Sequence, residues 1–182
     1  MFDVIIIGGG PGGYVAAEEA GLLGLKTALI EKDALGGTCL NRGCIPTKSM
    51  LNSVKLYKHA QHSGQFGITA EHVALDFSAL MNWKNQSVTK LVSGIEFLMK
   101  KHNITVYKGT GTILEPHKVS IAETGEVLEG KHIIIASGSE PALPPIPGIK
   151  DNDCILTSDS ILTIQALPAS LCIIGAVLLV WN

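Results

Sequence analysis

The chain opens on a mostly apolar run that stops abruptly at a cluster of glycines. Residues 2–7, Phe-Asp-Val-Ile-Ile-Ile, are rich in β-branched side chains, as expected of a strand buried in a parallel sheet. Alanines on neighbouring turns of residues 12–23 suit a helix packed flush on a sheet, with Gly24 as its C-cap, and residues 26–30 are expected as a second strand. The pattern predicts strand, helix and strand in order, the unit of α/β folds.

A long helix is expected in the middle of the chain. Asp76 can cap a helix over residues 77–102, in which apolar residues recur at helical spacing with lysines opposite. We expect this apolar stripe to be core or a subunit contact rather than a ligand site. Its members are Leu80, Val88, Leu91, Val92, Ile95, Leu98 and Met99.

Several short strands are predicted after this helix. Residues 104–107 read as a third strand of the sheet, and residues 112–113, 119–121 and 127–128 as a small antiparallel meander separated by turns. Residues 132–136 then return to the sheet. The fold class is therefore α/β: a Rossmann-like dinucleotide-binding domain with a parallel sheet and a small antiparallel meander.

A proline-rich stretch divides the chain. Four prolines lie between residues 141 and 148, which marks a linker and a domain boundary. We expect residues 1–148 to form the dinucleotide-binding domain without its C-terminal segment, and residues 149–182 to be a linker and a remnant of a second domain.

The last residues resemble the beginning of another dinucleotide-binding unit. Residues 171–175, Leu-Cys-Ile-Ile-Gly, read as its first strand, but no glycine follows Gly175, so the phosphate-binding loop cannot be built. We expect residues 171–180 to be a strand or an unsupported apolar tail, and the chain to be truncated, as by a frameshift.

Composition narrows the possible functions. The 182 residues are 46% hydrophobic, enough for one core, and the net charge of −2 without a basic block gives no reason to expect nucleic acid or a membrane surface as a partner. The longest apolar run, residues 171–181, is too short to span a bilayer, which takes about 20 residues. A strand that starts at residue 2 leaves no room for a signal or transit peptide, so we expect a cytoplasmic protein.

The first glycines carry a dinucleotide fingerprint. Gly8, Gly10 and Gly13 have the spacing GxGxxG, in which the first glycine allows a tight turn, the second lets backbone N–H groups approach a pyrophosphate, and the third permits close helix–sheet packing. Glu31, at the end of the second strand, can accept hydrogen bonds from ribose hydroxyls and would repel a 2′-phosphate. The alternative is a glycine-rich turn without a ligand.

Cys39 and Cys44 suggest redox chemistry. In an ideal helix the rise between them would be about 7.5 Å, beyond the usual Cα separation in a disulfide, so a bridge needs an irregular turn, which Gly43 can supply. Pro46 fits the first turn of a following helix. Cys44 would then lie near a helix N-terminus with Lys48 one turn on, and both features favour a thiolate.

Other readings of the cysteines stay open. A zinc site would need ligand spacings that neither cysteine has, so no metal is expected; two unpaired buried cysteines or a structural disulfide are further alternatives. Cys154 and Cys172 have apolar neighbours and are expected in the core. None of the six histidines has a catalytic context.

The segment 36–48, Gly-Gly-Thr-Cys-Leu-Asn-Arg-Gly-Cys-Ile-Pro-Thr-Lys, resembles the redox-active disulfide motif of the pyridine nucleotide-disulfide oxidoreductases. Leu40 and Ile45 make it most similar to the dihydrolipoamide dehydrogenase branch. The glycine fingerprint, Glu31 and residues 136–139, Ala-Ser-Gly-Ser, extend the resemblance, with Ser137 where the family has threonine.

The resemblance implies an FAD-dependent oxidoreductase. Cys39 would exchange with the dithiol substrate, and Cys44 would face the flavin as a charge-transfer thiolate, since exchange needs an accessible sulfur and electron transfer one buried against the ring. Lys48 would lie near the reactive edge of the flavin. The expected FAD contacts are Gly8, Gly10, Gly12, Gly13, Glu31, Lys32, Gly37, Thr38, Lys48, Gly111, Ser137, Gly138 and Ser139.

It also implies partners and a second hypothesis. The intact enzyme would be a homodimer that passes electrons from dihydrolipoamide of a 2-oxoacid dehydrogenase or glycine-cleavage complex to NAD, in the cytoplasm or, after removal of a presequence, the mitochondrial matrix. The family's base, a histidine of a C-terminal domain, has no counterpart here. The alternative is a noncatalytic fragment that binds flavin or cycles a dithiol, and the chain alone is expected to be inactive.

Overall fold

The computed structural model describes residues 1–150 and 152–175 and contains one six-stranded sheet. Its strand order is β3-β2-β1-β6-β5-β4, with parallel pairing from β3 to β6 and antiparallel pairing from β6 to β4. The predicted parallel sheet with an antiparallel meander is therefore confirmed. The strands are β1 (Phe2–Ile7), β2 (Thr27–Glu31), β3 (Thr105–Lys108), β4 (Gly111–Glu115), β5 (Lys118–Ile121) and β6 (Val127–Ile135).

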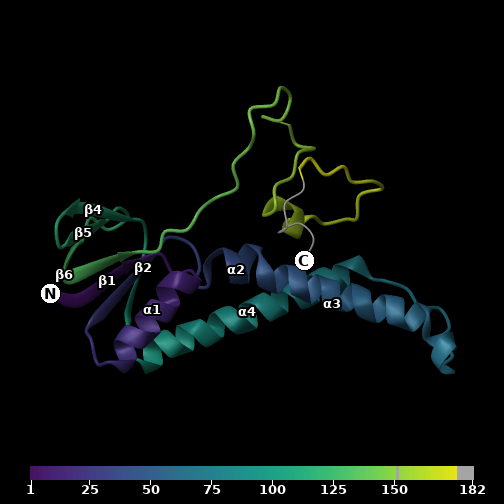
Figure 1. Cartoon of the computed structure of the whole chain (residues 1–182), viewed down its shortest axis with the longest axis horizontal. Helices are drawn as coiled ribbons and strands as arrows, with labels where there is room; N and C mark the ends of the chain where they lie inside the picture. Colours follow the sequence, from purple (N-terminus) through teal and green to yellow (C-terminus); the bar gives the residue numbers. More distant parts are fainter. Residues whose placement is uncertain (151, 176–182) are drawn as a thin grey trace.

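The helices form a layer beside the sheet and a long hairpin that extends away from it (Figure 1). The two long helices, α3 and α4, run antiparallel and pack against each other. The sequence predicts both helices, and the bounds of α4 agree with the expected residues 77–102. The helices are α1 (Pro11–Leu22), α2 (Gly37–Arg42), α3 (Cys44–Gln61) and α4 (Phe77–Lys101), with short 3-10 helices η1 (Ser63–Phe66) and η2 (Ser160–Thr163).

Two clusters of buried side chains cover the two faces of β1 and β2. On one face Ile6 and Leu29 pack with Ala17 of α1 and with Ile95 and Met99 of α4. The small alanine lets α1 lie close to the sheet, as predicted. On the other face the meander supplies the cover, and the cluster consists of Ile5, Ala28, Ile30, Val119, Ile121 and Leu128.

Strand β6 differs from the sequence prediction. Residues 127–128 and 132–136 were expected as two separate strands, whereas Val127–Ile135 form one strand that pairs with β5 at its start and with β1 along its remainder. Gly130 makes this possible, because a Cβ there would lie 2.8 Å from the Ile5 side chain. The meander is thus continuous with the parallel sheet.

Helix α4 begins as predicted and departs from the expected pattern at one lysine. The Asp76 carboxylate accepts a hydrogen bond of 3.0 Å from the backbone N–H of Ala79, the arrangement of an N-cap. Lys84 does not lie on a solvated face, since only 5% of it is exposed. Its ammonium donates a hydrogen bond of 2.6 Å to the carbonyl of Leu162, a contact that brings η2 to α4.

The C-terminal third has little regular structure. Residues 141–148 form neither helix nor strand and are exposed, as a linker would be. Cys154 and Cys172 are exposed, so their prediction as core residues is wrong: their apolar neighbours in sequence do not pack around them. Residues 171–175 form no strand and are exposed, and residues 176–180 of the predicted strand or tail lie outside the described residues.

No helix in residues 1–150 or 152–175 combines the length and the apolar character needed to cross a membrane.

Candidate functional site

A cavity of about 510 Å³ lies at the carboxyl ends of β1, β2 and β6. This is the edge of a parallel sheet where ligands bind in open α/β folds, and the volume lies in the usual range of about 300–1,000 Å³ for ligand pockets. All the residues predicted to contact a cofactor line it except Gly13 and Lys48. The cavity is lined by Ile7, Gly8, Gly10, Pro11, Gly12, Ile30, Glu31, Lys32, Gly37, Thr38, Arg42, Gly109, Thr110, Gly111, Ala136, Ser137, Gly138, Ser139 and Glu140.

The glycine turn shapes one wall of the cavity. Gly8 has φ +104°, a conformation that favours glycine, and a Cβ at Gly13 would overlap the Gly8 carbonyl. Gly13 therefore acts through packing under the turn, which explains why it does not line the cavity. Pro11, the first residue of α1, has no N–H, and the N–H groups of Gly13 and Tyr14 donate to the carbonyl of Gly10, the N-cap. Gly12 therefore supplies the N–H of the first turn that can serve an anion.

Gly37 closes the turn from the other side. Its φ is +55°, and a Cβ on it would lie 2.6 Å from the Cα of Gly10. A Cβ at Gly10 itself would be 3.7 Å from the nearest atom, the Cα of Gly37. Position 37 therefore requires glycine, because the two backbones approach closely there. At position 10 the protein itself leaves room for a Cβ, so the absence of a side chain matters only for the space that faces the cavity.

Glu31 braces the loops that surround the cavity. One carboxylate oxygen accepts a hydrogen bond of 2.6 Å from Gly9 N–H, and the other accepts one of 2.7 Å from Asp33 N–H. The carboxylate predicted to bind a ribose therefore also fixes the glycine turn. Each oxygen keeps further acceptor capacity for a hydroxyl donor.

Charged residues stand around the cavity in pairs. The ammonium of Lys32 lies 3.0 Å from the carboxylate of Glu140. The Arg42 guanidinium lies 3.3 Å from Asp33 and 3.6 Å from Asp159. Arg42 and Glu140 were not predicted from the sequence, because their partners are far away in the chain; the position of Arg42 between the two cysteines was the only available signal.

The two cysteines lie at a break between helices. Helix α2 ends at Arg42, Gly43 has φ −147° and ψ −109°, and Cys44 starts α3. The irregular turn expected at Gly43 is present, and Pro46 lies in the first turn of α3 as predicted. A Cβ at Gly43 would lie 2.9 Å from the Thr38 carbonyl, so the break requires a residue without a side chain.

The environment of the cysteines is asymmetric. Cys39 is half-buried and packs against the core under α4, whereas Cys44 is exposed, which is the reverse of the order expected from the assigned roles. Burial raises the pKa of the Cys39 thiol, the neighbouring Cys44 raises it further, and Lys48 partly offsets both. Both residues are free thiols in the structure, and the disulfide between them stays a prediction.

The described residues contain no group of three or more histidines, cysteines and carboxylates that could hold a metal ion.

Comparison with known proteins gives consistent matches. The sequence profile of the family "Pyridine nucleotide-disulphide oxidoreductase" matches residues 2–178. Similar proteins include dihydrolipoyl dehydrogenase of Acholeplasma laidlawii, 43% identical over 96% of this chain and 52% of that protein, and the mitochondrial dihydrolipoyl dehydrogenase of Pisum sativum, 47% identical over 96% of this chain and 36% of that protein.

A solved structure shares the fold. The HOCl-induced flavoprotein disulfide reductase RclA from Escherichia coli aligns with a TM-score of 0.75 and 29% sequence identity, over 91% of this chain and 35% of that chain. The chain thus spans about half the length of the Acholeplasma relative, and less of the other two proteins.

Proposed function

Because the chain belongs to the pyridine nucleotide-disulphide oxidoreductase family, we propose that it supplies the flavin site and the redox dithiol of a dihydrolipoyl dehydrogenase. Identity above 40% to such enzymes supports this branch. The single observation that carries the proposal is the position of Cys39 and Cys44, which flank a helix break directly beside the cavity residues Gly37 and Thr38.

The cavity residues fit FAD. The start of α1 offers the backbone N–H of Gly12 to a pyrophosphate, and the open side of Gly10 leaves room for it. Glu31 has acceptor capacity for the ribose hydroxyls, and the backbone of Ser137 to Ser139 lines the opposite wall. FAD, when bound, would supply the chemistry of a two-electron acceptor for the reduced cysteine pair.

The dithiol step assigned to the cysteines balances without another reactant. A thiolate of dihydrolipoamide attacks the Cys39 sulfur, the Cys39–Cys44 bond breaks, and Cys44 leaves as a thiolate. The second thiol of the substrate then displaces Cys39 from the mixed disulfide. The substrate loses two electrons and becomes a cyclic disulfide, and the protein pair gains them as two thiols.

The pKa of Cys39 supports this direction of attack. Burial raises it, and a thiolate of high pKa is a poor leaving group. The disulfide therefore breaks more readily when Cys39 is attacked and Cys44 leaves. The greater exposure of Cys44 affects how often a thiol meets it, whereas the pKa decides which sulfur leaves.

The remaining roles follow from the proposed branch. Lys48, one turn after Cys44 on α3, would stabilise negative charge near the cysteine pair, since it lowers the pKa of Cys39. The electrons would pass to NAD in a homodimer that serves a 2-oxoacid dehydrogenase or glycine-cleavage complex, in the cytoplasm or the mitochondrial matrix. Residues 1–148 would be the FAD-binding domain, and residues 149–182 would lead into the NAD-binding unit.

Trapping of the mixed disulfide tests the proposal. The oxidised chain, in a Cys154→Ser/Cys172→Ser background that leaves only the predicted pair, is incubated with dihydrolipoamide that carries a methyl group on one sulfur, so that the mixed disulfide cannot cyclise. Free thiols are then alkylated, and the adduct is located by mass spectrometry. We expect the adduct at Cys39 and an alkylated Cys44. An adduct only at Cys44 would reverse the two roles, and no reduction of the wild-type pair by dihydrolipoamide would refute the function.

A second candidate is a chain that cycles a dithiol without passing electrons to NAD. It is favoured by residues 171–175, which are exposed and form no strand of a second nucleotide-binding unit. Assay of the purified chain with dihydrolipoamide, NAD and added FAD separates the two candidates. Sustained NADH production that is lost in Cys44→Ser would exclude this second function.

A further inference from the structure

Arg42 connects three parts of the chain that are distant in sequence. It is the last residue of α2 and lies between the two cysteines. Its guanidinium lies 3.3 Å from Asp33, which precedes α2, and 3.6 Å from Asp159, which lies beyond the proline-rich linker. Asp159 is the less exposed of the two carboxylates, with 25% of its side chain accessible against 59% for Asp33.

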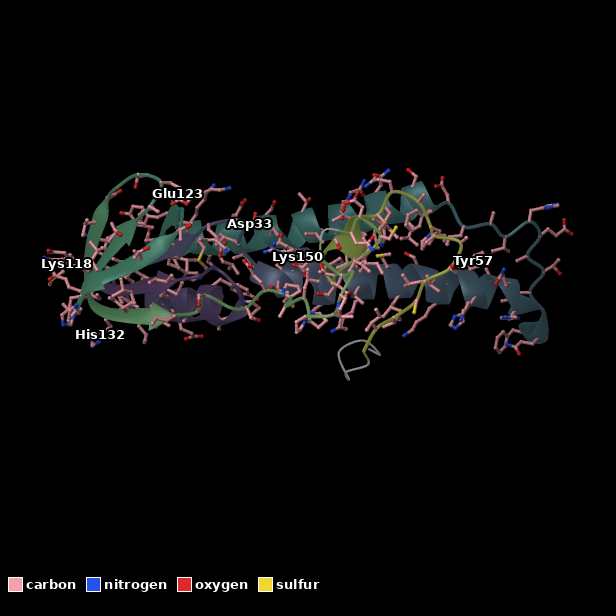
Figure 2. The ribbon with its side chains drawn as sticks, turned by 90° about the horizontal axis from the view of Figure 1, so that it is seen from above. Asp33, Tyr57, Lys118, Glu123, His132 and Lys150 are labelled. Carbon is pink, nitrogen blue, oxygen red and sulfur yellow. The ribbon has the colours of Figure 1, made fainter. Side chains whose placement is uncertain are left out.

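The segment that carries Asp159 is itself held in place. Its turn is closed by a hydrogen bond of 2.8 Å from Thr157 N–H to the Ser160 hydroxyl. The buried ammonium of Lys84 holds the Leu162 carbonyl from α4. Figure 1 shows the short helix η2 of this segment, in yellow-green, above the region where α2 meets α3, and Figure 2, seen from above, shows it over α4.

The break between α2 and α3 makes the contacts of Arg42 important for the position of the two cysteines. Gly43 has no side chain that could fix the angle between α2 and α3, and Cys39 and Cys44 lie on opposite sides of it. The separation of the two sulfurs therefore depends on contacts made by the ends of these helices. Arg42 forms ion pairs with two carboxylates, Asp33 and Asp159. A single exposed ion pair would stabilise the position of α2 very little.

We propose that Arg42 is a positioning residue for the cysteine pair, which it holds in the disulfide-forming arrangement by binding α2 to Asp33 and to Asp159 of the segment after the linker. This inference rests on the proposed function of Cys39 and Cys44 as a redox pair. It follows that the disulfide-to-dithiol equilibrium depends on the segment around Asp159, which follows the proline-rich linker.

Redox titration of the whole chain tests this role. The wild type and the variants Arg42→Met, Asp159→Asn and the double variant are equilibrated in dithiothreitol buffers of graded potential, and the oxidised fraction of Cys39 and Cys44 is measured by alkylation and mass spectrometry. We expect Arg42→Met to lower the disulfide-to-dithiol equilibrium constant by about two- to thirtyfold, the range for the loss of two exposed ion pairs. Asp159→Asn is expected to lower it by a smaller factor, and the double variant by no more than Arg42→Met alone.

A matched control separates positioning from loss of charge. Lys118 also bridges two carboxylates, Glu115 at 2.6 Å and Glu129 at 3.8 Å, and has similar exposure. It lies at the far end of the sheet (Figure 2). Lys118→Met is expected to leave the equilibrium constant unchanged.

Four outcomes would count against the proposal. Equal constants for Arg42→Met and Lys118→Met would overturn it, and so would additive effects of Arg42→Met and Asp159→Asn, because additivity means that the two residues act independently. If the wild-type cysteines form no disulfide at any potential, the proposed function fails and this inference falls with it. A normal wild-type disulfide that is insensitive to Arg42 overturns this inference alone.

Discussion

Replacement of Gly13 by alanine should destabilise the fold strongly. A Cβ at this position would overlap the Gly8 carbonyl oxygen and lie 2.9 Å from its carbon. Both are backbone atoms of a turn fixed by β1, so neither can move aside as a flexible side chain would. Overpacking of this kind costs about 1–3 kcal/mol, and we expect the upper end, since the obstacle is rigid.

The expected loss can be measured by thermal and urea unfolding of the purified chain. For a chain of this size, about 3 kcal/mol corresponds to a fall of roughly 6–12 °C in Tm. Gly94→Ala is the matched control, because it lies inside α4 and its Cβ would meet nothing within 4 Å; it should raise the free energy of unfolding by about 0.5–1 kcal/mol. A Tm of Gly13→Ala within 2 °C of the wild type, roughly what 1 kcal/mol changes, would refute the packing argument.

Three further changes test other parts of the structure. Asp76→Ala should lower the free energy of unfolding by about 1 kcal/mol in urea titration through loss of the N-cap, and Asp76→Asn should retain most of it. Burial raises the pKa of Cys39 above 9.0, so the rate of its alkylation in the reduced chain should keep rising with pH beyond 9.0, because the thiolate is the reacting form. A rate that levels off below pH 9 would contradict this. Burial lowers the pKa of Lys84 below 10.5, so folding disfavours its charged form, and the free energy of unfolding should rise as the pH increases toward 10.5. Lys84→Met should weaken that rise. If the variant and the wild type show the same dependence of Tm on pH, Lys84 is not its cause.

The elements and the cofactor cavity could be predicted from local patterns. The apolar run before Gly8, the helical spacing after Asp76 and the glycine fingerprint each depend on neighbours in the chain, and the structure follows them within one or two residues at most ends. The predicted cavity residues come from the glycine fingerprint, from Glu31 at the end of the second strand, and from the resemblance of residues 36–48 and 136–139 to the motifs of the family.

The features that the sequence did not predict depend on contacts between distant residues. Lys84 is buried because Leu162 lies against it, and Arg42 reaches the cavity rim between Asp33 and Asp159. Cys154 and Cys172 have apolar neighbours, yet no element packs over them. The spacing of apolar residues along the chain carries no information about contacts between distant residues. From the sequence, Lys84 and Arg42 therefore look like ordinary surface residues, and Cys154 and Cys172 look like core residues.

The continuity of β6 has a consequence for how the molecule opens. One strand shares its hydrogen bonds with β5 at one end and with β1 at the other, and Val119 and Ile121 of the meander are buried together with Ile5 of the central strand. Detachment of the meander would therefore expose one face of the central strands. Amides of β1, β5 and β6 should exchange with solvent deuterium through a common cooperative opening, with the same free energy, rather than in separate steps.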